Sequence, residues 1–293
     1  MYELIQAGEK SWYIKSPANV GVYRMNDEEV CLIDSGNDKD AGRKILKIIT
    51  ERGWRVSCIV NTHSNSDHTG GNQFIQGRTG CRVLSTDVEN AVSRHPMLEP
   101  TMLYGGYPYA KLRNKFLMAK PTEKTCGIVD GLPAGLSVIK LPGHYFDMIG
   151  IMTDDGVCFL ADSIFRREII EKYHIVFIYD VAKFLETLDM IETLEAKLFV
   201  PAHADAAEDV HKLTAANRAK VLEIAELLVG LCREPKTFEK ILKAVFDHYG
   251  LTMDDNQHVL VGSTIKSYLS YLYDNGRVKA EFIDNEMLWS AAQ

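Results

Sequence analysis

Four apolar runs of β-strand type in this chain each lead directly into a histidine or an aspartate. A strand that ends in this way holds an imidazole or carboxylate group at the mouth of a sheet, where a divalent cation can gather several of them. The pattern constrains the fold, because the four strand ends must meet if their side chains serve one site. The runs are 56–60, 136–140, 157–160 and 197–200, and the residues after them are His63, His144, Asp162 and His203.

The segment after the first run is the densest in side chains that bind metals. His63, Asp67 and His68 all lie within six residues of one another. The alternative is that histidine and aspartate at a strand-to-loop junction serve as caps or solvated turn residues. Because three further strands end in the same kind of residue, we interpret the segment as part of a metal site.

Length and charge fit one large domain with a small one and argue against some functions. The chain has 293 residues, and 46% are hydrophobic, as in soluble globular proteins. The net charge of −7 argues against nucleic acid as a partner, because phosphate binding needs a basic surface. No window approaches ~20 uninterrupted apolar residues and the amino terminus lacks a signal pattern, so we expect a soluble, cytoplasmic protein with no membrane contact.

Cysteine usage agrees with that location. The chain has six cysteines, and no pair has zinc-ribbon spacing. Cys31, Cys58 and Cys158 lie inside apolar runs, where a reduced thiol behaves as a small buried hydrophobe. This usage indicates a reducing compartment.

Apolar periodicity predicts the α/β class. The first segment alternates apolar and polar residues, which predicts antiparallel strands. Ile45, Ile48 and Ile49, followed by Gly53, predict a helix and its end. Strands and helices then alternate, and a second helix is expected over 181–194. Two sheets with helices outside them are the layered solution that this pattern favours. The expected strands lie near 12–14, 20–24, 30–33, 136–140, 149–153, 157–161 and 197–200.

The spacing becomes helical after about residue 210. Three helical faces begin near Val221, Phe238 and Val261. Residues 277–282 and 286–289 then predict a hairpin across Asp284 and Asn285. We therefore divide the chain into a domain over 1–210 and a helical domain over 211–293.

The order of motifs resembles the metallo-β-lactamase superfamily of metallohydrolases over roughly residues 12 to 210. The resemblance implies an αββα sandwich, and the C-terminal domain resembles the winged-helix module of some family members. The motifs are Leu32-Ile33-Asp34-Ser35-Gly36, Thr62-His63 through His68 with Gly70-Gly71-Asn72, Pro142-Gly143-His144, Ala161-Asp162 and Pro201-Ala202-His203.

The resemblance also implies two metal sites that share one ligand. Asn65 stands where the family motif has its second histidine, and an amide oxygen is a poor donor to zinc, although it suits harder ions. We therefore expect one well-held ion in the second site, with the first site weak, selective for a different ion, or empty, and so one or two ions per chain. Zinc is the first expectation, with iron and manganese as alternatives. The implied ligands are His63, position 65 and His144 for the first site, Asp67, His68 and His203 for the second, and Asp162 for both.

Two aspartates have further expected roles. Asp67, close to an activated water and unable to donate when ionised, is the expected catalytic residue that orients this water or takes its proton. Asp34 is expected to accept a hydrogen bond from a metal-bound histidine. The alternative for Asp34 is an ordinary turn residue before Ser35 and Gly36.

Four residues are candidates for substrate binding. Tyr104 and Tyr107 lie in a long segment, 95–118, that is rich in aromatic residues, glycine and proline. This segment is expected at the metal mouth, with packing or a homodimer contact as alternatives. Arg166 is suited to an anionic substrate group, with a solvated turn as the alternative. His174 is a candidate pocket residue, with a buried core histidine as the alternative.

Three functions compete at this point. The first is a metal-dependent hydrolase that acts on an ester, thioester, lactone or phosphoester of a small substrate. The second is a non-haem iron oxygenase or redox enzyme that uses His63, His144 and Asp162. The third is a nucleic-acid-processing protein that uses the C-terminal domain, against which the acidic start of its third helix argues. Activity against β-lactams comes last, because a fold does not supply a substrate. We therefore predict a metal-dependent hydrolase.

Overall fold

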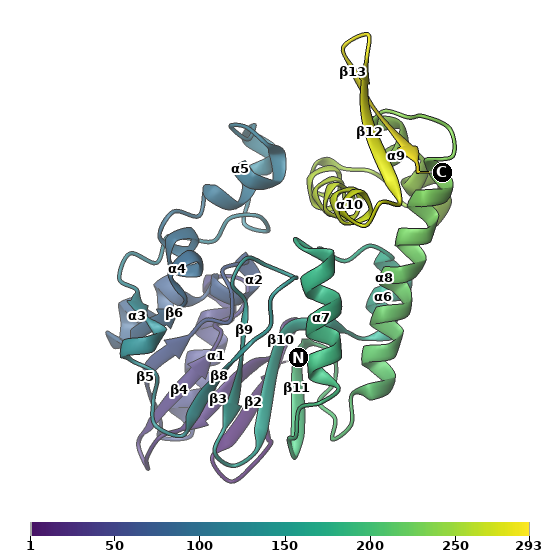
Figure 1. Ribbon diagram of the computed structural model, residues 1–293. Coiled ribbons are helices and arrows are strands. Elements are labelled where there is room, and N and C mark those ends of the chain that lie inside the picture. The colour runs from purple at the N-terminus through teal and green to yellow at the C-terminus, as the bar shows by residue number, and fades with distance from the viewer. Residues whose placement is uncertain (1, 293) are drawn as a thin grey trace.

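The computed structural model describes residues 2–292, and its core is a pair of β-sheets with helices on their outer faces (Figure 1). Within the described residues the first sheet has seven strands that neighbour one another in chain order. Its first four strands are antiparallel, and from the fourth onward the strands run parallel. These strands are β1 (Glu3–Gln6), β2 (Ser11–Lys15), β3 (Val20–Arg24), β4 (Glu29–Ile33), β5 (Arg55–Val60), β6 (Arg82–Ser85) and β7 (Cys126–Gly127).

The second sheet has the strand order β11-β10-β9-β8. Its only parallel pair among the described residues is β10 with β11, and the connection between them contains two helices. The strands are β8 (Leu136–Lys140), β9 (Ile149–Thr153), β10 (Val157–Phe165) and β11 (Leu198–His203), and the connecting helices are α6 (Arg167–Tyr173) and α7 (Val181–Ile191).

Three apolar layers hold the sandwich together. The central layer joins the sheets through residues such as Ile33 of the first and Ile151 and Phe159 of the second. An outer layer packs the first sheet against its helices, and another packs the second sheet against α7 and the helices after it. The α/β class and the αββα arrangement are therefore confirmed. The helices beside the first sheet are α1 (Lys39–Glu51), α2 (Ser66–Thr69), α3 (Asn72–Thr79) and α4 (Asp87–Arg94), and η2 (Ile128–Asp130) follows β7.

The C-terminal part consists of three helices and a hairpin. The hairpin turns at Asp284 and Asn285, which both have positive φ, as a two-residue type I′ turn requires. The expected boundary at 210/211 coincides with the start of α8, but one apolar cluster runs from β10 across α8 to α10. A separate C-terminal domain and its winged-helix character stay predictions. The elements are α8 (His211–Leu231), α9 (Phe238–Tyr249), α10 (Asp255–Asp274), β12 (Val278–Ile283) and β13 (Glu286–Ala291).

The long segment 95–118 folds against the C-terminal part. It contains α5 (Leu98–Tyr104) and η1 (Ala110–Leu112). Its buried leucines form a small apolar cluster with Val259 of α10, namely Leu103, Leu112 and Leu117. Tyr109 donates a hydrogen bond to Asp255 over 2.7 Å. In Figure 1, α5 and α10 lie at the same end of the sandwich.

The expectations about the cysteines and about membrane-spanning segments can be compared with the structure. All six cysteines are free thiols, and five of them are buried. None of the helices in the described part of the chain is both long enough and apolar enough to span a membrane.

Gly143 lets the loop after β8 approach α7 closely. It has φ +122°, and a Cβ atom at this position would lie 2.3 Å from the backbone nitrogen of Phe184. The Gly143 carbonyl oxygen accepts hydrogen bonds from the amides of Tyr179 and Asp180. The next residue is His144, so this contact fixes where that imidazole enters the site.

We predict that Gly143→Ala lowers the free energy of unfolding by about 2–4 kcal/mol, because it adds a clash with backbone to an unfavourable φ. Gly53→Ala is the matched control. Gly53 also has positive φ, but a Cβ atom added there would meet nothing within 4 Å, so we expect a loss of about 1 kcal/mol. Denaturant unfolding followed by circular dichroism measures both values, and equal losses would contradict the clash.

Candidate metal centre

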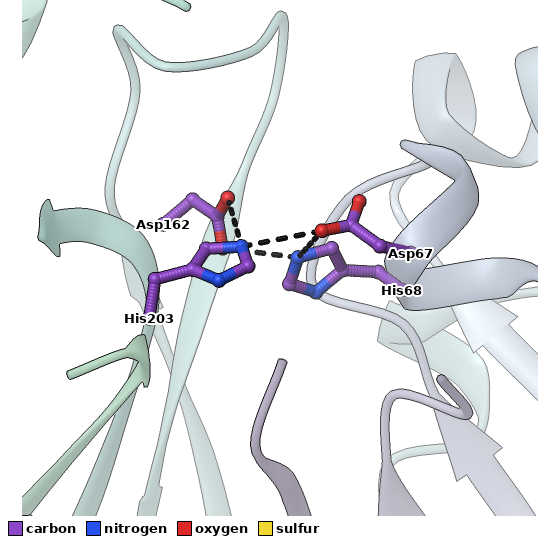
Figure 2. Close-up of side chains that lie close together, drawn as sticks. All are labelled: Asp67, His68, Asp162 and His203. Atoms are coloured by element: carbon purple, nitrogen blue, oxygen red, sulfur yellow. Dashed lines mark ion pairs between the residues drawn. The ribbon is translucent and has the colours of Figure 1, made fainter. Parts of the chain in front are cut away.

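The sequence-predicted metal ligands come together at one end of the sandwich. Asp67 and His68 lie in the short helix α2, while Asp162 belongs to β10 and His203 is the last residue of β11. Figure 2 shows these four side chains facing one another, with the α2 residues on one side and the strand residues on the other. Two groups result, each compact enough that its donor atoms lie within 4.8 Å of one another.

The second site contains Asp67, His68, Asp162 and His203. The Nε2 atom of His203 lies 3.1 Å from Asp162 Oδ2 and 3.2 Å from Asp67 Oδ2. The Nε2 atom of His68 lies 3.0 Å from Asp162 Oδ1 and 3.7 Å from Asp67 Oδ2. Asp67 has the most exposed of these side chains, at 39%, so one of its faces is open to a substrate.

The first site contains His63, His144 and Asp162, all of them buried. His144 Nε2 lies 3.5 Å from Asp162 Oδ2, and the rings of His63 and His144 have centroids 5.1 Å apart. Because Asp162 belongs to both groups, its carboxylate lies between the two sites.

Hydrogen bonds to Nδ1 hold the imidazole rings so that each Nε2 atom faces the candidate metal ligands across the site. His68 Nδ1 donates to Asp34, His144 Nδ1 to the carbonyl of Phe177, and His203 Nδ1 to the carbonyl of Pro17. The ring proton is therefore on Nδ1, which leaves the Nε2 lone pair for a cation.

His63 is oriented through Thr62. The Thr62 hydroxyl donates to Asp34 Oδ2 over 2.8 Å, so the hydroxyl oxygen, Thr62 Oγ1, accepts from His63 Nδ1 at 3.1 Å. Asp34 also accepts from the Thr62 backbone amide over 2.8 Å and from His68 Nδ1 over 2.8 Å. Asp34 thus occupies the orienting position expected from the sequence.

The donor set fits a divalent cation. Among the described residues, His63 Nε2, His68 Nε2 and Asp162 Oδ1 are buried atoms with no hydrogen-bond partner. His68 Nε2 and Asp162 Oδ1 are close together, but their geometry is not that of a hydrogen bond. Buried polar atoms are rarely left unpaired, and imidazole nitrogen with carboxylate oxygen is a set that zinc and iron both accept.

The buried carboxylates of the candidate metal centre also need positive charge nearby. Burial would raise the pKa of the Asp162 carboxyl, but His203 and His68 outweigh it and hold this pKa well below its usual range. Burial would lower the pKa of His203, yet Asp162 and Asp67 raise it to about 10. In the absence of a metal, protons on imidazoles balance the carboxylates. A divalent cation would take their place and release them.

Backbone strain accompanies two of the site residues. Ala161, next to Asp162, has φ 49°, and the register of β10 with β11 shifts around it. Asp34 has φ 68°. Residues other than glycine adopt this region at a cost of about 1–3 kcal/mol, and such strain clusters at functional sites.

Two buried glutamates were not expected from the sequence. Glu89 of α4 accepts from the amide and hydroxyl of Ser64 and from the amide of Asp147, which ties the loop after β5 to the loop before β9. Burial raises the pKa of both Glu89 and Glu99. Glu99 of α5 accepts from Asn65 Nδ2 over 2.8 Å. No local pattern marks them, because a buried acid on a helix has the same sequence spacing as an exposed one.

A cavity of about 650 Å³ opens above the two sites. We call it the site cavity. Apolar walls come from the strand end at Phe165, from 175–177 and from α10, and its cationic side chains are Lys115, Arg166 and Lys172. The lining also contains Pro17, Asn37, Asn65, Ser66, Asp67, Glu99, Phe116, His144, Asp162, Glu168, Ile169, Tyr173, His203, Gln257, Leu260 and Val261.

Only one of the four candidates for substrate binding lines the site cavity among the described residues. Arg166 lines the site cavity, but Tyr104, Tyr107 and His174 are not among the described residues that line it. Tyr107 is 72% exposed, and Tyr104 packs against Tyr109. His174 stacks on Tyr249 with a ring separation of 4.5 Å. A role in substrate binding stays a prediction for these residues.

We predict that Asp34→Asn weakens zinc binding about 10-fold to 100-fold, as the loss of an orienting carboxylate typically does. An amide has one acceptor atom, so it cannot accept from both the Thr62 backbone amide and His68 Nδ1, which contact different oxygens of Asp34. Competition with a chromogenic chelator measures the affinity. Asp38→Asn is the control, because Asp38 caps α1 and asparagine also serves as a cap. Unchanged affinity in the Asp34 variant would refute this role.

Curated relatives match only part of this chain. A hydroxyacylglutathione hydrolase from Methylococcus capsulatus is 42% identical over 124 residues, which is 41% of this chain and 39% of the relative. A hydroxyacylglutathione hydrolase from Rhizobium etli is 30% identical over 122 residues, again 41% of this chain and 39% of the relative. The match thus spans about two fifths of the length of these relatives.

Solved structures and a family model extend the comparison. A beta-lactamase domain protein from Burkholderia ambifaria has a TM-score of 0.72 at 20% identity and covers 99% of this chain and 94% of its own. A metallo-beta-lactamase family protein from Thermus thermophilus has a TM-score of 0.72 at 18% identity, covering 99% and 98%. At such identities the likeness establishes the fold. The model of the metallo-beta-lactamase superfamily matches residues 14–203, and this chain belongs to that superfamily.

Proposed function

We propose that this protein is a metal-dependent hydrolase whose substrate is a small thioester. The observation that carries the proposal is the convergence of both ligand groups beneath an open cavity. The partial relatives named hydroxyacylglutathione hydrolase support the choice of a thioester over an ester, lactone or phosphoester.

Zinc is the proposed ion of the second site, where two imidazole nitrogens and two carboxylates converge. A bound divalent cation lowers the pKa of water to about 7 and polarises a carbonyl oxygen. The chain supplies the rest. Asp34 fixes the ring of His68, and the carbonyl of Pro17 fixes the ring of His203.

Asp67 is the proposed catalytic residue. Its carboxylate faces the site cavity, and Oδ2 lies 3.2 Å from His203 Nε2. Burial would raise the pKa of this carboxyl, but His68 and His203 hold it below its usual range, so it is ionised at neutral pH. An ionised carboxylate accepts a proton from water and orients that water toward the thioester carbonyl.

The cavity lining indicates the shape of the substrate. Phe165, Phe177 and Leu260 offer an apolar surface for the acyl group. Within the described part of the chain neither Arg166 nor Lys172 forms an ion pair, although Lys172 Nζ lies over the Tyr173 ring, 4.8 Å from its centroid. Neither charge is paired with a carboxylate, so we propose that both attract an anionic group on the thiol carrier.

A non-haem iron oxygenase is the second candidate. The observation in its favour is the buried group of His63, His144 and Asp162, which has the two-histidine, one-carboxylate composition of such sites. Oxygen uptake by the iron-loaded protein without hydrolysis would select it.

Nucleic acid is not a proposed partner. Asp255 at the start of α10 lies 3.2 Å from Lys111 Nζ and accepts from Tyr109, so this end of the helix is acidic and already packed. We propose that the C-terminal helices serve as a cavity wall.

We predict that the zinc-loaded protein hydrolyses a hydroxyacylglutathione, with loss of the thioester ultraviolet absorbance, and that chelation abolishes the reaction. Asp67→Asn should lower kcat at least ~100-fold, the usual contribution of a positioned base. Asp27→Asn, an exposed turn substitution, is the control. Equal rates with and without metal, or no turnover by the loaded protein, would overturn the proposal.

We predict that Arg166→Ala raises KM for an anionic thioester about 5-fold and leaves kcat nearly unchanged, because an accessible charge contact contributes about 1 kcal/mol. Arg167→Ala is the matched control, since Arg167 is also exposed but is not among the residues that line the cavity. The same KM in both variants would exclude this role for Arg166.

A further inference from the structure

Asn65 replaces a family histidine, and its amide lies between a histidine of the first site and a buried carboxylate. Its Oδ1 atom is 3.1 Å from His144 Nε2, and its Nδ2 atom donates to Glu99 Oε1 over 2.8 Å. Glu99 is only 4% exposed, and both residues line the site cavity. The Oδ1 end of the amide therefore faces the candidate metal ligand His144, and the Nδ2 end is anchored by Glu99.

At the end of the Asn65 amide that faces His144, two hydrogen-bond acceptors lie in contact, Asn65 Oδ1 and His144 Nε2. His144 Nδ1 donates to the carbonyl of Phe177 over 2.9 Å, so Nε2 of the neutral ring carries a lone pair. Asn65 Oδ1 also carries only lone pairs. Two such atoms 3.1 Å apart repel each other unless a proton or a metal cation lies between them, or unless the amide turns and presents its N–H to the ring.

Glu99 opposes that turn. Glu99 Oε1 accepts from Asn65 Nδ2 over 2.8 Å, so a turned amide would lose this hydrogen bond and place Asn65 Oδ1 against Glu99 Oε1. The hydrogen bond to Glu99 at one end and a cation at the other end would therefore hold the amide in one orientation.

We propose that Asn65 is a ligand of the first metal site through Oδ1 and that Glu99 is the positioning residue that holds it there. With His63 Nε2, His144 Nε2 and a carboxylate oxygen of Asp162, the site has two nitrogen and two oxygen donors. Amide and carboxylate oxygens suit harder ions, so the change from histidine to Asn65 weakens this site for zinc and leaves a donor set that accepts Mn²⁺ or Fe²⁺. The proposal concerns the metal centre of the proposed hydrolase, but it is tested by metal binding and does not require turnover.

The test is Mn²⁺ binding, followed by electron paramagnetic resonance, to protein whose second site already holds one equivalent of zinc. The wild-type chain should bind one Mn²⁺. Glu99→Met removes the anchor with an unbranched side chain of similar length, and binding should weaken about 10-fold to 100-fold, as for other residues that orient a ligand. Retention of the single zinc ion and an unchanged circular dichroism spectrum show that the variant is folded.

A double variant distinguishes loss of the Glu99 hydrogen bond to residue 65 from a packing defect caused by the Glu99 substitution. Both side-chain ends of aspartate are oxygens, so N65D needs no anchor, and the combination of N65D with E99M should bind Mn²⁺ at least as tightly as wild type. Asn65→His should instead raise the zinc content toward two ions per chain. Wild-type affinity in E99M, failure of the double variant to recover binding, or an unchanged zinc count in N65H would each overturn the proposal. Loss of hydrolysis with these binding results intact would count against the proposed function alone.

Discussion

The carboxylate of Asp162 is the charge on which the metal centre depends. Its side chain is 5% exposed and lies within 3.5 Å of imidazole nitrogens from three histidines. A buried charge is costly unless it is paired and hydrogen-bonded, yet Asp162 Oδ1 has no hydrogen-bond partner among the described residues. Positive charge must therefore come from protonated imidazoles or from a cation. Protons and a metal ion would thus compete for the same lone pairs, and a bound metal ion would displace the protons.

The fold brings this charge to the right place at a cost in backbone strain. Asp162 follows Ala161, whose positive φ accompanies the register shift between β10 and β11. On the opposite sheet, Asp34 has positive φ directly after β4, and from there its two oxygens reach Thr62 and His68. Each strained residue lies where a strand of the core ends or bends at the metal centre. The packed layers behind the strands supply the stability that allows this strain.

Much of this arrangement could be predicted from the sequence, because strand ends carry a local pattern. An apolar run followed by histidine or aspartate is visible without a structure, and the sheet topology brings four such ends together. Asp34 could be predicted for the same reason. Glu89 and Glu99 could not, because their burial arises from the way α4 and α5 pack, and helical spacing does not reveal it. Tyr104 and Tyr107 were chosen for their aromatic character, but the segment 95–118 directs Glu99, Lys115 and Phe116 toward the cavity instead.

The site cavity is lined by residues inside and outside the range of the superfamily match. The candidate metal ligands lie between residues 63 and 203, inside the range matched by the superfamily model. Gln257, Leu260 and Val261 of α10 lie outside this range, yet they line the same cavity. Their helix is held in place by contacts such as that of Asn114 with Asn256 over 2.9 Å. The superfamily match thus covers the candidate metal ligands but not the part of the cavity wall that α10 supplies. The proposed acyl surface combines Phe165 and Phe177, which lie inside the matched range, with Leu260 of α10, which lies outside it. A change at Leu260 would therefore alter the proposed acyl surface without altering the candidate metal ligands.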